Sequence, residues 1–149
     1  MAPAFAAPVA GGGYTDGEVI SLKSLRGSRV VLVFYPKDNT PGCTTQACAL
    51  RDRWEDVASH AKIFGVSPDS VNSHRKFVDQ QQLPYPLLAD TEKQIIQAYG
   101  VWVEKSLYGR KYMGTERSTF IISPDGKIET VLEKVQPKEH LKRLLAALG

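Results

Sequence analysis

The sequence predicts an α/β domain in which a central mixed sheet is flanked by helices. Three observations lead to this class. A continuous apolar run, Val30–Tyr35, is typical of a strand that is buried on both faces. A helical pattern follows it from Cys43 to Val57, where apolar residues recur at spacings of three and four. Strand and helix patterns then alternate again before a hairpin and a last helix.

The composition is that of an ordinary globular chain. Its 149 residues are 42% hydrophobic and 23% charged, and this length suits one domain that spans 1–149. No apolar run approaches the roughly 18 residues of a membrane-spanning helix, so we expect no membrane association. The alanine-rich start has no basic residue before Lys23, unlike a secretory signal peptide. We therefore expect a cytoplasmic protein in which residues 1–12 form a loosely ordered arm.

The first strand and the first helix are joined by a polar turn. Val30–Tyr35 is rich in β-branched and aromatic residues, and Pro36 ends it because proline cannot donate to a sheet ladder. The turn passes through Gly42, and the helix begins near Cys43. The apolar face of that helix consists of Ala47, Leu50, Trp54 and Val57.

The middle of the chain predicts a second strand and a second helix. Lys62–Val66 is the strand, and Asp69 or Ser70 can cap a helix that runs to about Gln81. Two prolines in Leu83–Leu88 keep that stretch extended.

The last third of the chain predicts a short helix, a hairpin and a final helix. Asp90 can cap the short helix. Ser118–Ile122 and Lys127–Leu132 flank a Pro-Asp-Gly turn and predict the hairpin. Pro137 suits the first turn of the final helix. The complete order of elements is that of a thioredoxin-like sheet with helices on both faces.

The charge pattern and the histidines exclude two further classes of function. The formal net charge is +3, and the basic stretch Lys138–Arg143 is interleaved with apolar residues, which predicts a solvated helix face and no nucleic-acid surface. His60, His74 and His140 are scattered and have no ligand spacing with the cysteines. We expect these histidines on the surface, and we expect no metal and no other cofactor.

Cys43 and Cys48 carry the most informative pattern. Two thiols are too few for a disulfide-stabilised secreted scaffold, and their closeness indicates redox chemistry. A pair of inert buried cysteines is the alternative. The spacing differs from the Cys-x-x-Cys of a disulfide reductase. A cysteine-dependent phosphatase or arsenate reductase needs an arginine six residues after the cysteine, where this chain has Ala49.

The order of strand, turn and helix places the sulfur of Cys43 at the start of a helix. Unpaired backbone N–H groups and the positive end of the helix dipole lie there, and both favour the nucleophilic thiolate. The hydroxyl of Thr40 can reach the thiolate or an oxygen atom of a substrate, and Pro36 can screen the thiolate from water. The alternatives are that Thr40 only caps the helix and that Pro36 is an ordinary turn residue.

The position of Cys48 makes a geometric prediction. Residues five apart on an ideal helix have Cα atoms roughly 8.6 Å apart, whereas a disulfide needs less than about 7 Å. Cys43 and Cys48 therefore cannot form a disulfide until the first turns of the helix unwind. This predicts a two-state site, folded for nucleophilic attack and locally unfolded for disulfide formation.

The segment Phe34–Thr44, FYPKDNTPGCT, is similar to the active-site signature of peroxiredoxins, and it most closely resembles the Q-type subgroup, also called bacterioferritin comigratory protein. A second segment, Tyr99–Phe120, agrees, and Arg117 within it corresponds to the family's active-site arginine. The subgroup's proline, threonine, peroxidatic cysteine and resolving cysteine correspond to Pro36, Thr40, Cys43 and Cys48.

The resemblance implies a thiol peroxidase that reduces hydrogen peroxide and organic hydroperoxides without a metal or haem. Cys43 would become a sulfenic acid, Cys48 would form an intramolecular disulfide with it (the atypical 2-Cys mechanism), and thioredoxin would reduce that disulfide. Arg117 would stabilise the thiolate and orient the peroxide, although an arginine that starts a strand otherwise indicates a surface charge. The resemblance also implies a monomer. A non-enzymatic binding module with the same fold is the remaining alternative.

Overall fold

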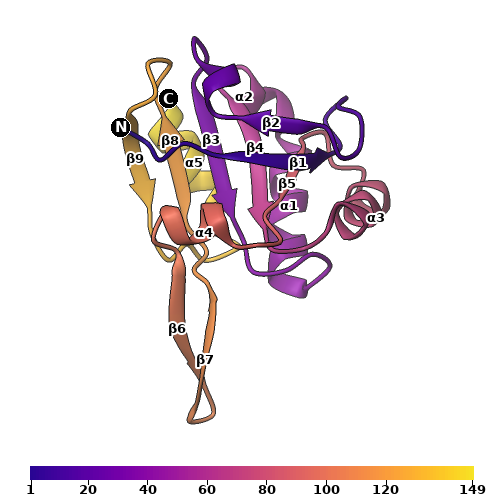
Figure 1. Ribbon diagram of the computed structural model, residues 1–149, viewed down its shortest axis with the longest axis vertical. Helices are drawn as coiled ribbons and strands as arrows, with labels where there is room; N and C mark the ends of the chain where they lie inside the picture. The colour runs from indigo at the N-terminus through magenta and orange to yellow at the C-terminus, as the bar shows by residue number, and fades with distance from the viewer.

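The computed structural model describes residues 1–149, with seven strands in one mixed sheet and two more in a separate hairpin (Figure 1). The order in the large sheet is β2-β1-β5-β4-β3-β8-β9. The strands are β1 (Ala6–Ala10), β2 (Val19–Ser21), β3 (Val30–Phe34), β4 (Lys62–Ser67), β5 (Leu87–Ala89), β6 (Trp102–Leu107), β7 (Arg110–Thr115), β8 (Thr119–Ile122) and β9 (Ile128–Leu132). The helices are α1 (Pro41–Asp52), α2 (Trp54–Ala58), α3 (Val71–Gln81), α4 (Gln94–Ala98) and α5 (His140–Leu148), with one 3-10 turn at Lys23–Leu25.

Strand β3 lies near the centre of the sheet and organises the core. All five of its residues are buried, and it pairs in parallel with β4 and antiparallel with β8. Alternate residues of β3 enter two core clusters, one shared with α4 and the other with α1, α3 and α5. Figure 1 shows α4 in front of the sheet and α1 and α5 behind it. The predicted mixed sheet with helices on both faces is confirmed. None of the helices is long and apolar enough to cross a membrane.

The expected loose arm at the N-terminus is wrong for residues 5–10. Strand β1 pairs antiparallel with β2 and, through Val9 and Ala10, with β5. The side chains of Val9 and Ala10 are completely buried, and Phe5 belongs to the core. An alanine-rich segment has little intrinsic preference for a strand. Its order therefore comes from pairing with a strand far along the chain, which local sequence does not reveal.

The helix that carries both cysteines is shorter than predicted. Its first helical residue is Pro41. Proline loses no hydrogen bond there, because an N–H at the first helical position has no intrahelical acceptor. The helix ends at Asp52, and Arg53 takes a non-helical backbone conformation before α2 begins. The predicted helix from Cys43 to Val57 is thus two helices, and both cysteines lie in the first.

Other helix boundaries are partly as predicted. Ser70 caps α3 and accepts the N–H of the third residue after it at 3.1 Å. Asp90 is not the N-cap of α4, a position that Lys93 holds, but its carboxylate accepts the N–H of Ile96 at 2.8 Å. Pro137 lies in a turn that precedes α5, so the prediction that it stands in the helix's first turn is wrong.

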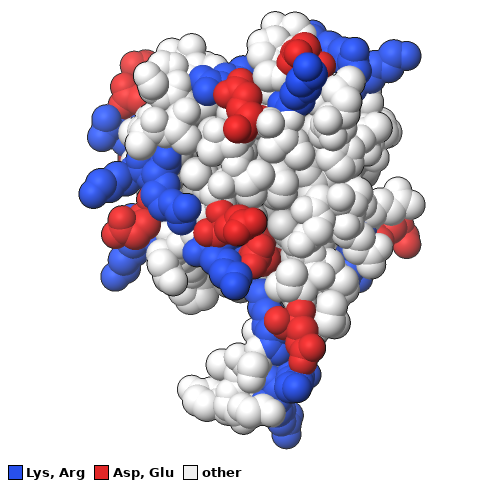
Figure 2. Space-filling view, turned by 90° about the vertical axis from the view of Figure 1, so that its left-hand side faces the viewer, with Lys and Arg blue, Asp and Glu red and all other residues white.

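The β6–β7 hairpin is the one large element that periodicity does not reveal. It projects from the body of the molecule (Figures 1 and 2). Tyr108 and Gly109 connect its strands with φ angles of 51° and 77°, the left-handed pair that a tight two-residue turn requires. Strand β7 then leads directly into the segment that carries Arg117.

Candidate active site

Cys43 is the third residue of α1, and its side chain is only 2% exposed. The helix begins after Thr40, so Gly42 and Cys43 belong to the first turn, where N–H groups have no intrahelical acceptor. No other acceptor in the chain bonds these two N–H groups. The sulfur therefore lies at the positive end of the helix, as the sequence predicts.

Arg117 supplies a cation to this sulfur. It lies between β7 and β8, and its Nη2 donates to the Sγ of Cys43 at 3.4 Å. Its Nη1 donates to the Oε1 of Gln46, and the backbone carbonyl of Arg117 accepts the N–H of Val135 at 2.8 Å. The backbone of Arg117 is thus anchored, and its guanidinium contacts both Gln46 and the thiol.

Gln46 is a site residue that the sequence analysis misses. It stands three residues after Cys43, so both side chains lie on the same face of α1. Gln46 is 2% exposed, and its Nε2 has no hydrogen-bond partner although it is buried. The helical spacing from Cys43 is the signal in the sequence that could have identified it.

Gly42 is a second residue whose role only the structure reveals. A Cβ at this position would lie 3.2 Å from Nη2 of Arg117 and 3.3 Å from Cγ of Pro137. The absence of a side chain therefore lets the guanidinium approach the helix start. The backbone of Gly42 is ordinary helix, so close approach and not conformational freedom explains the glycine.

Thr40 and Pro36 are both half-buried in the loop that leads to α1. The Oγ1 of Thr40 donates to the carbonyl of Lys37 at 2.9 Å. Thr40 occupies the N-cap position but makes no capping hydrogen bond through its side chain, so simple capping does not explain this residue. No hydrogen bond joins Thr40 to Cys43.

Cys48 lies on the same uninterrupted helix, and its surroundings are different. Its thiol is half-buried and donates to the Oε1 of Gln81, at the end of α3, at 3.3 Å. Arg51 donates to the backbone carbonyl of Gln81 at 2.8 Å. Both cysteines are free thiols. This arrangement agrees with the prediction that no disulfide joins them while α1 is intact.

A small cavity lies beside Cys43, between α1 and the sheet. Its walls are mostly apolar, with Tyr35, Gln46 and Tyr85 among them. Burial raises the pKa of Tyr35 and of Tyr85 well above the usual range of a tyrosine. Both hydroxyls are therefore protonated, and the cavity offers no general base. The chemistry of the site depends on the thiol and on the donors around it.

The expectation that the histidines lie on the surface is wrong for two of the three. His60 is exposed, but His74 and His140 are completely buried. The Nε2 of His140 lies 2.8 Å from the Oγ1 of Thr119, two residues beyond Arg117. Burial lowers the pKa of His140 to about 4, with a smaller effect of the nearby arginines. His140 is therefore neutral at pH 7.

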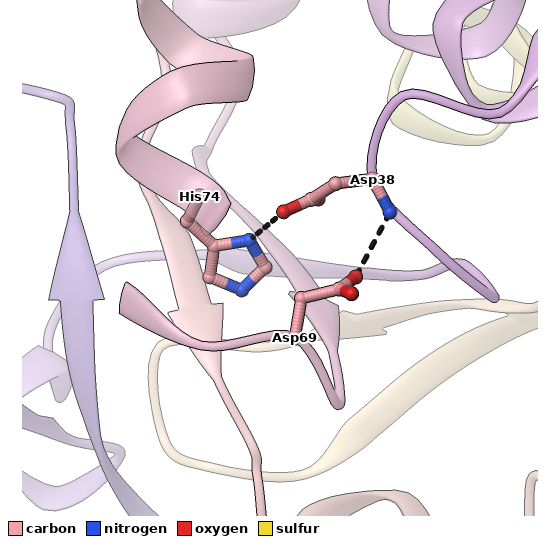
Figure 3. A group of neighbouring side chains, drawn as sticks. All are labelled: Asp38, Asp69 and His74. Atoms are coloured by element: carbon pink, nitrogen blue, oxygen red, sulfur yellow. Dashed lines mark hydrogen bonds and ion pairs between the residues drawn. The ribbon is translucent and has the colours of Figure 1, made fainter. Parts of the chain in front are cut away.

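Figure 3 shows the one group of side chains with the geometry of a possible metal site, Asp38, Asp69 and His74. Their ligand atoms lie within 4.8 Å of one another. Each atom already has a partner, however. Nδ1 of His74 bonds Asp38 at 2.7 Å, Nε2 bonds the carbonyl of Leu88 at 3.0 Å, and Asp69 accepts the N–H of Asp38 at 2.9 Å. The cluster is a saturated hydrogen-bond network, and the residues do not fit a metal ligand set.

Comparisons with known proteins agree with this geometry. A model of the AhpC/TSA family matches residues 1–131. A putative peroxiredoxin bcp of Coxiella burnetii is 40% identical over 148 residues, covering 99% of this chain and 95% of the relative. Peroxiredoxin Bcp of Bacillus subtilis is 46% identical over 133 residues, covering 89% of this chain and 85% of the relative.

Solved structures lead to the same group. A bacterioferritin comigratory protein of Xanthomonas campestris is 36% identical, with a TM-score of 0.86 over 97% of this chain and 89% of that chain. A mutant of peroxiredoxin Q from the same organism has a TM-score of 0.87 at 36% identity, with the same coverage. These relatives are peroxidases, which decides against a non-enzymatic binding module. The chain belongs to the AhpC/TSA family and is a thiol peroxidase of the peroxiredoxin Bcp/Q group.

Proposed function

We propose that Cys43 is the peroxidatic cysteine, that Cys48 is the resolving cysteine, and that thioredoxin reduces the disulfide between them. The observation that carries this assignment is the contact of 3.4 Å between Nη2 of Arg117 and the sulfur of Cys43 in the first turn of α1. A guanidinium is permanently cationic, so it favours the thiolate form of a sulfur that it contacts. Cys48 has no such contact.

In the first step the thiolate of Cys43 attacks one oxygen of a hydroperoxide and the O–O bond breaks. The sulfur becomes a sulfenic acid, and the other oxygen leaves as water or an alcohol after it takes up a proton. Negative charge grows on the leaving oxygen. The guanidinium of Arg117 and the free N–H groups of Gly42 and Cys43 are fixed donors that stabilise this charge.

Thr40 and Pro36 complete the pocket in this proposal. Because the proton of the Thr40 hydroxyl is donated to Lys37, its oxygen is left to accept a hydrogen bond from the O–H of the peroxide. This would orient the peroxide for attack by Cys43. Pro36, half-buried at the end of β3, would restrict access of bulk water to the thiolate.

In the second step the start of α1 unwinds, and the thiol of Cys48 attacks the sulfenic acid. An S–S bond forms and water leaves. Unwinding must break the contacts of Arg117 with Cys43 and Gln46, or the contact of Cys48 with Gln81. A dithiol reductant then restores both thiols by exchange.

The reductant, the oligomeric state and the compartment are also part of the proposal. Thioredoxin is the expected dithiol donor, and the chain acts as a monomer on hydrogen peroxide and organic hydroperoxides. The chain has only two cysteines, and their close spacing suits redox chemistry in the reducing cytoplasm, where structural disulfides are rare. No metal or cofactor takes part in the proposed steps.

The test compares Cys43→Ser with Cys48→Ser. Cys43→Ser should not consume peroxide. Cys48→Ser should consume about one equivalent and then stop in an assay with thioredoxin, thioredoxin reductase and NADPH. Mass spectrometry should detect a sulfenic acid at Cys43 in that variant. Full turnover of Cys48→Ser would show that Cys48 is not required for resolution, and oxidation of Cys48 before Cys43 would reverse the assignment.

A further inference from the structure

The loop between β3 and α1 carries Pro36 and Thr40 but has no regular secondary structure of its own. The backbone groups of residues 36–39 take part in no backbone–backbone hydrogen bond. Asn39 has a left-handed backbone, with φ of 58°, a conformation that asparagine adopts more readily than most residues other than glycine. Something other than secondary structure must therefore hold this loop in place.

Asp38 is the residue that fixes the loop. Its side chain is buried, and three donors converge on its carboxylate. The hydroxyl of Tyr35 donates to Oδ1 at 2.6 Å, the hydroxyl of Ser73 donates to Oδ2 at 2.8 Å, and Nδ1 of His74 lies 2.7 Å from Oδ2. The N–H of Asp38 donates to Asp69 at 2.9 Å. One residue of the loop is thus attached to α3, to the turn before it and to the end of β3.

The contacts of His74 indicate which of its ring nitrogens can donate. Nε2 lies 3.0 Å from the carbonyl oxygen of Leu88, which only accepts, so Nε2 carries a proton. Nδ1 faces a carboxylate that already accepts two hydroxyl protons, an arrangement that suits an anion. A proton on Nδ1 would supply the third donor to this carboxylate, and the hydroxyl of Tyr35 lies farther from Nδ1, at 3.5 Å. A second carboxylate, Asp69, adds further negative charge to the group (Figure 3).

We infer that Asp38 and His74 form a buried ion pair that positions the Pro36–Thr40 loop for the reaction of Cys43 with peroxide. This inference rests on the proposed function, because it assigns Cys43 the peroxide step and Thr40 a role in orienting the substrate. Asp38 and His74 do not touch the reacting atoms. They are positioning residues that act through the loop, which enters α1 two residues after Asp38 at Thr40.

The charge of His74 is testable in the wild-type protein by NMR of the imidazole nitrogens at pH 7. We expect both nitrogens of His74 to be protonated. The chain has three histidines, and His140, whose pKa is lowered to about 4 by burial, supplies a neutral reference. His60→Gln removes the exposed histidine and helps to assign the signals. A neutral ring at His74 would overturn the ion pair.

The positioning role is tested with Asp38→Asn and His74→Gln, and with the exposed His60→Gln as the matched control. Two rates of Cys43 are measured in each variant, oxidation by hydrogen peroxide in stopped flow and alkylation by iodoacetamide. Alkylation needs an accessible thiolate but no oriented peroxide. We expect the rate of peroxide oxidation to fall about 10²-fold in Asp38→Asn, which is the loss that a displacement of the loop by about 1 Å would cause. Alkylation should stay within about threefold of wild type.

The outcomes separate the two proposals. Equal peroxide rates in wild type and in Asp38→Asn, or a parallel fall of both rates, would overturn the positioning role. A wild-type Cys43 that peroxide does not oxidise would refute the proposed function itself. If Asp38→Asn does not fold, Ser73→Ala removes one donor from the same carboxylate and should lower the peroxide rate alone, by a smaller factor. No change in that variant would count against the role of the network.

Discussion

The two cysteines of α1 lie five positions apart in one helix, yet their surroundings differ in charge and in burial. Cys43 is 2% exposed and receives a hydrogen bond from the cation Arg117, next to free N–H groups of the helix start. Cys48 is half-buried and bonds the neutral amide of Gln81. Arg51, three residues after Cys48, bonds the carbonyl of Gln81 and the carboxylate of Asp52.

Because of this difference, one helix can prepare two thiols for different steps of the proposed mechanism. Cys43, which reacts as an anion in the proposed mechanism, is held by fixed positive groups, which stabilise a thiolate before any substrate binds. The second thiol needs only to remain intact and to be available later, so a neutral contact is sufficient. The contacts of Cys43 come from the segment before β8, whereas those of Cys48 come from the end of α3. The two halves of the helix are therefore attached to different parts of the fold.

The largest effect is expected when the cation that contacts Cys43 is removed. Arg117→Ala removes the cation and one of the donors at the Cys43 sulfur, so we expect the rate of Cys43 oxidation by peroxide to fall about 10²- to 10³-fold. The resolution step should not become slower, because the contacts of Arg117 with Cys43 and Gln46 hold the start of α1 in place. Stopped-flow oxidation of Cys43 measures the effect, with the exposed Arg143→Ala as the control. An unchanged rate in a folded Arg117→Ala would remove this residue from the mechanism.

The next prediction concerns His140, which contacts Thr119 two residues beyond Arg117. His140 is neutral in the folded protein because burial lowers its pKa from 6.5 to about 4. Between these values the unfolded chain binds more protons than the folded one, so the free energy of unfolding rises with pH in this window. The contribution is complete above about pH 6.5, and on the order of 3 kcal/mol is lost as the pH falls towards 4.

Urea unfolding at pH 4 to 7 measures this dependence. His140→Gln should flatten it, because the amide keeps a polar contact near Thr119 but does not titrate. His60→Gln, at an exposed position, should keep the wild-type slope. An identical slope in all three proteins would show that His140 is not the group that titrates.

A smaller effect is expected from a single added methyl group. Gly42→Ala places a Cβ 3.2 Å from Nη2 of Arg117 and 3.3 Å from Pro137, so the guanidinium must shift away from Cys43. We expect the peroxide rate to fall about tenfold while stability stays nearly constant, because alanine favours the helix. Thr45→Ala, on the exposed side of the same turn, is the control. A rate equal to wild type would show that the oxidation of Cys43 does not depend on the exact position of the Arg117 guanidinium.

The smallest effect is expected when the neutral contact of Cys48 is removed. Gln81→Ala removes the acceptor of the Cys48 thiol, so Cys48 is released more easily and disulfide formation should become about two- to fivefold faster. The peroxide step at Cys43 should not change. Quenched-flow mass spectrometry follows the sulfenic acid and the disulfide separately, with the neighbouring Gln80→Ala as the control. A slower resolution step would show that Gln81 guides Cys48 towards its partner instead of retaining it.

Much of the fold follows from short stretches of sequence. The apolar run of β3, the Ser70 cap of α3 and the β8–β9 hairpin are encoded by residues within a few positions of one another, and they form as predicted. Strand β1 and the β6–β7 hairpin do not follow in this way. The first depends on pairing with β5, and the second has no clear alternation of apolar residues.

The amino-acid sequence alone predicts that one thiol begins a helix and that the second, five residues later, is out of disulfide reach while the helix is intact. Both facts depend only on helix geometry, which is local and regular. Only the tertiary structure decided what surrounds each thiol. Arg117 is 74 positions from Cys43, Gln81 is 33 from Cys48, and His74 is 36 from Asp38. Such contacts exist because the packing of the whole sheet brings distant segments together, and no periodicity along the chain records that packing.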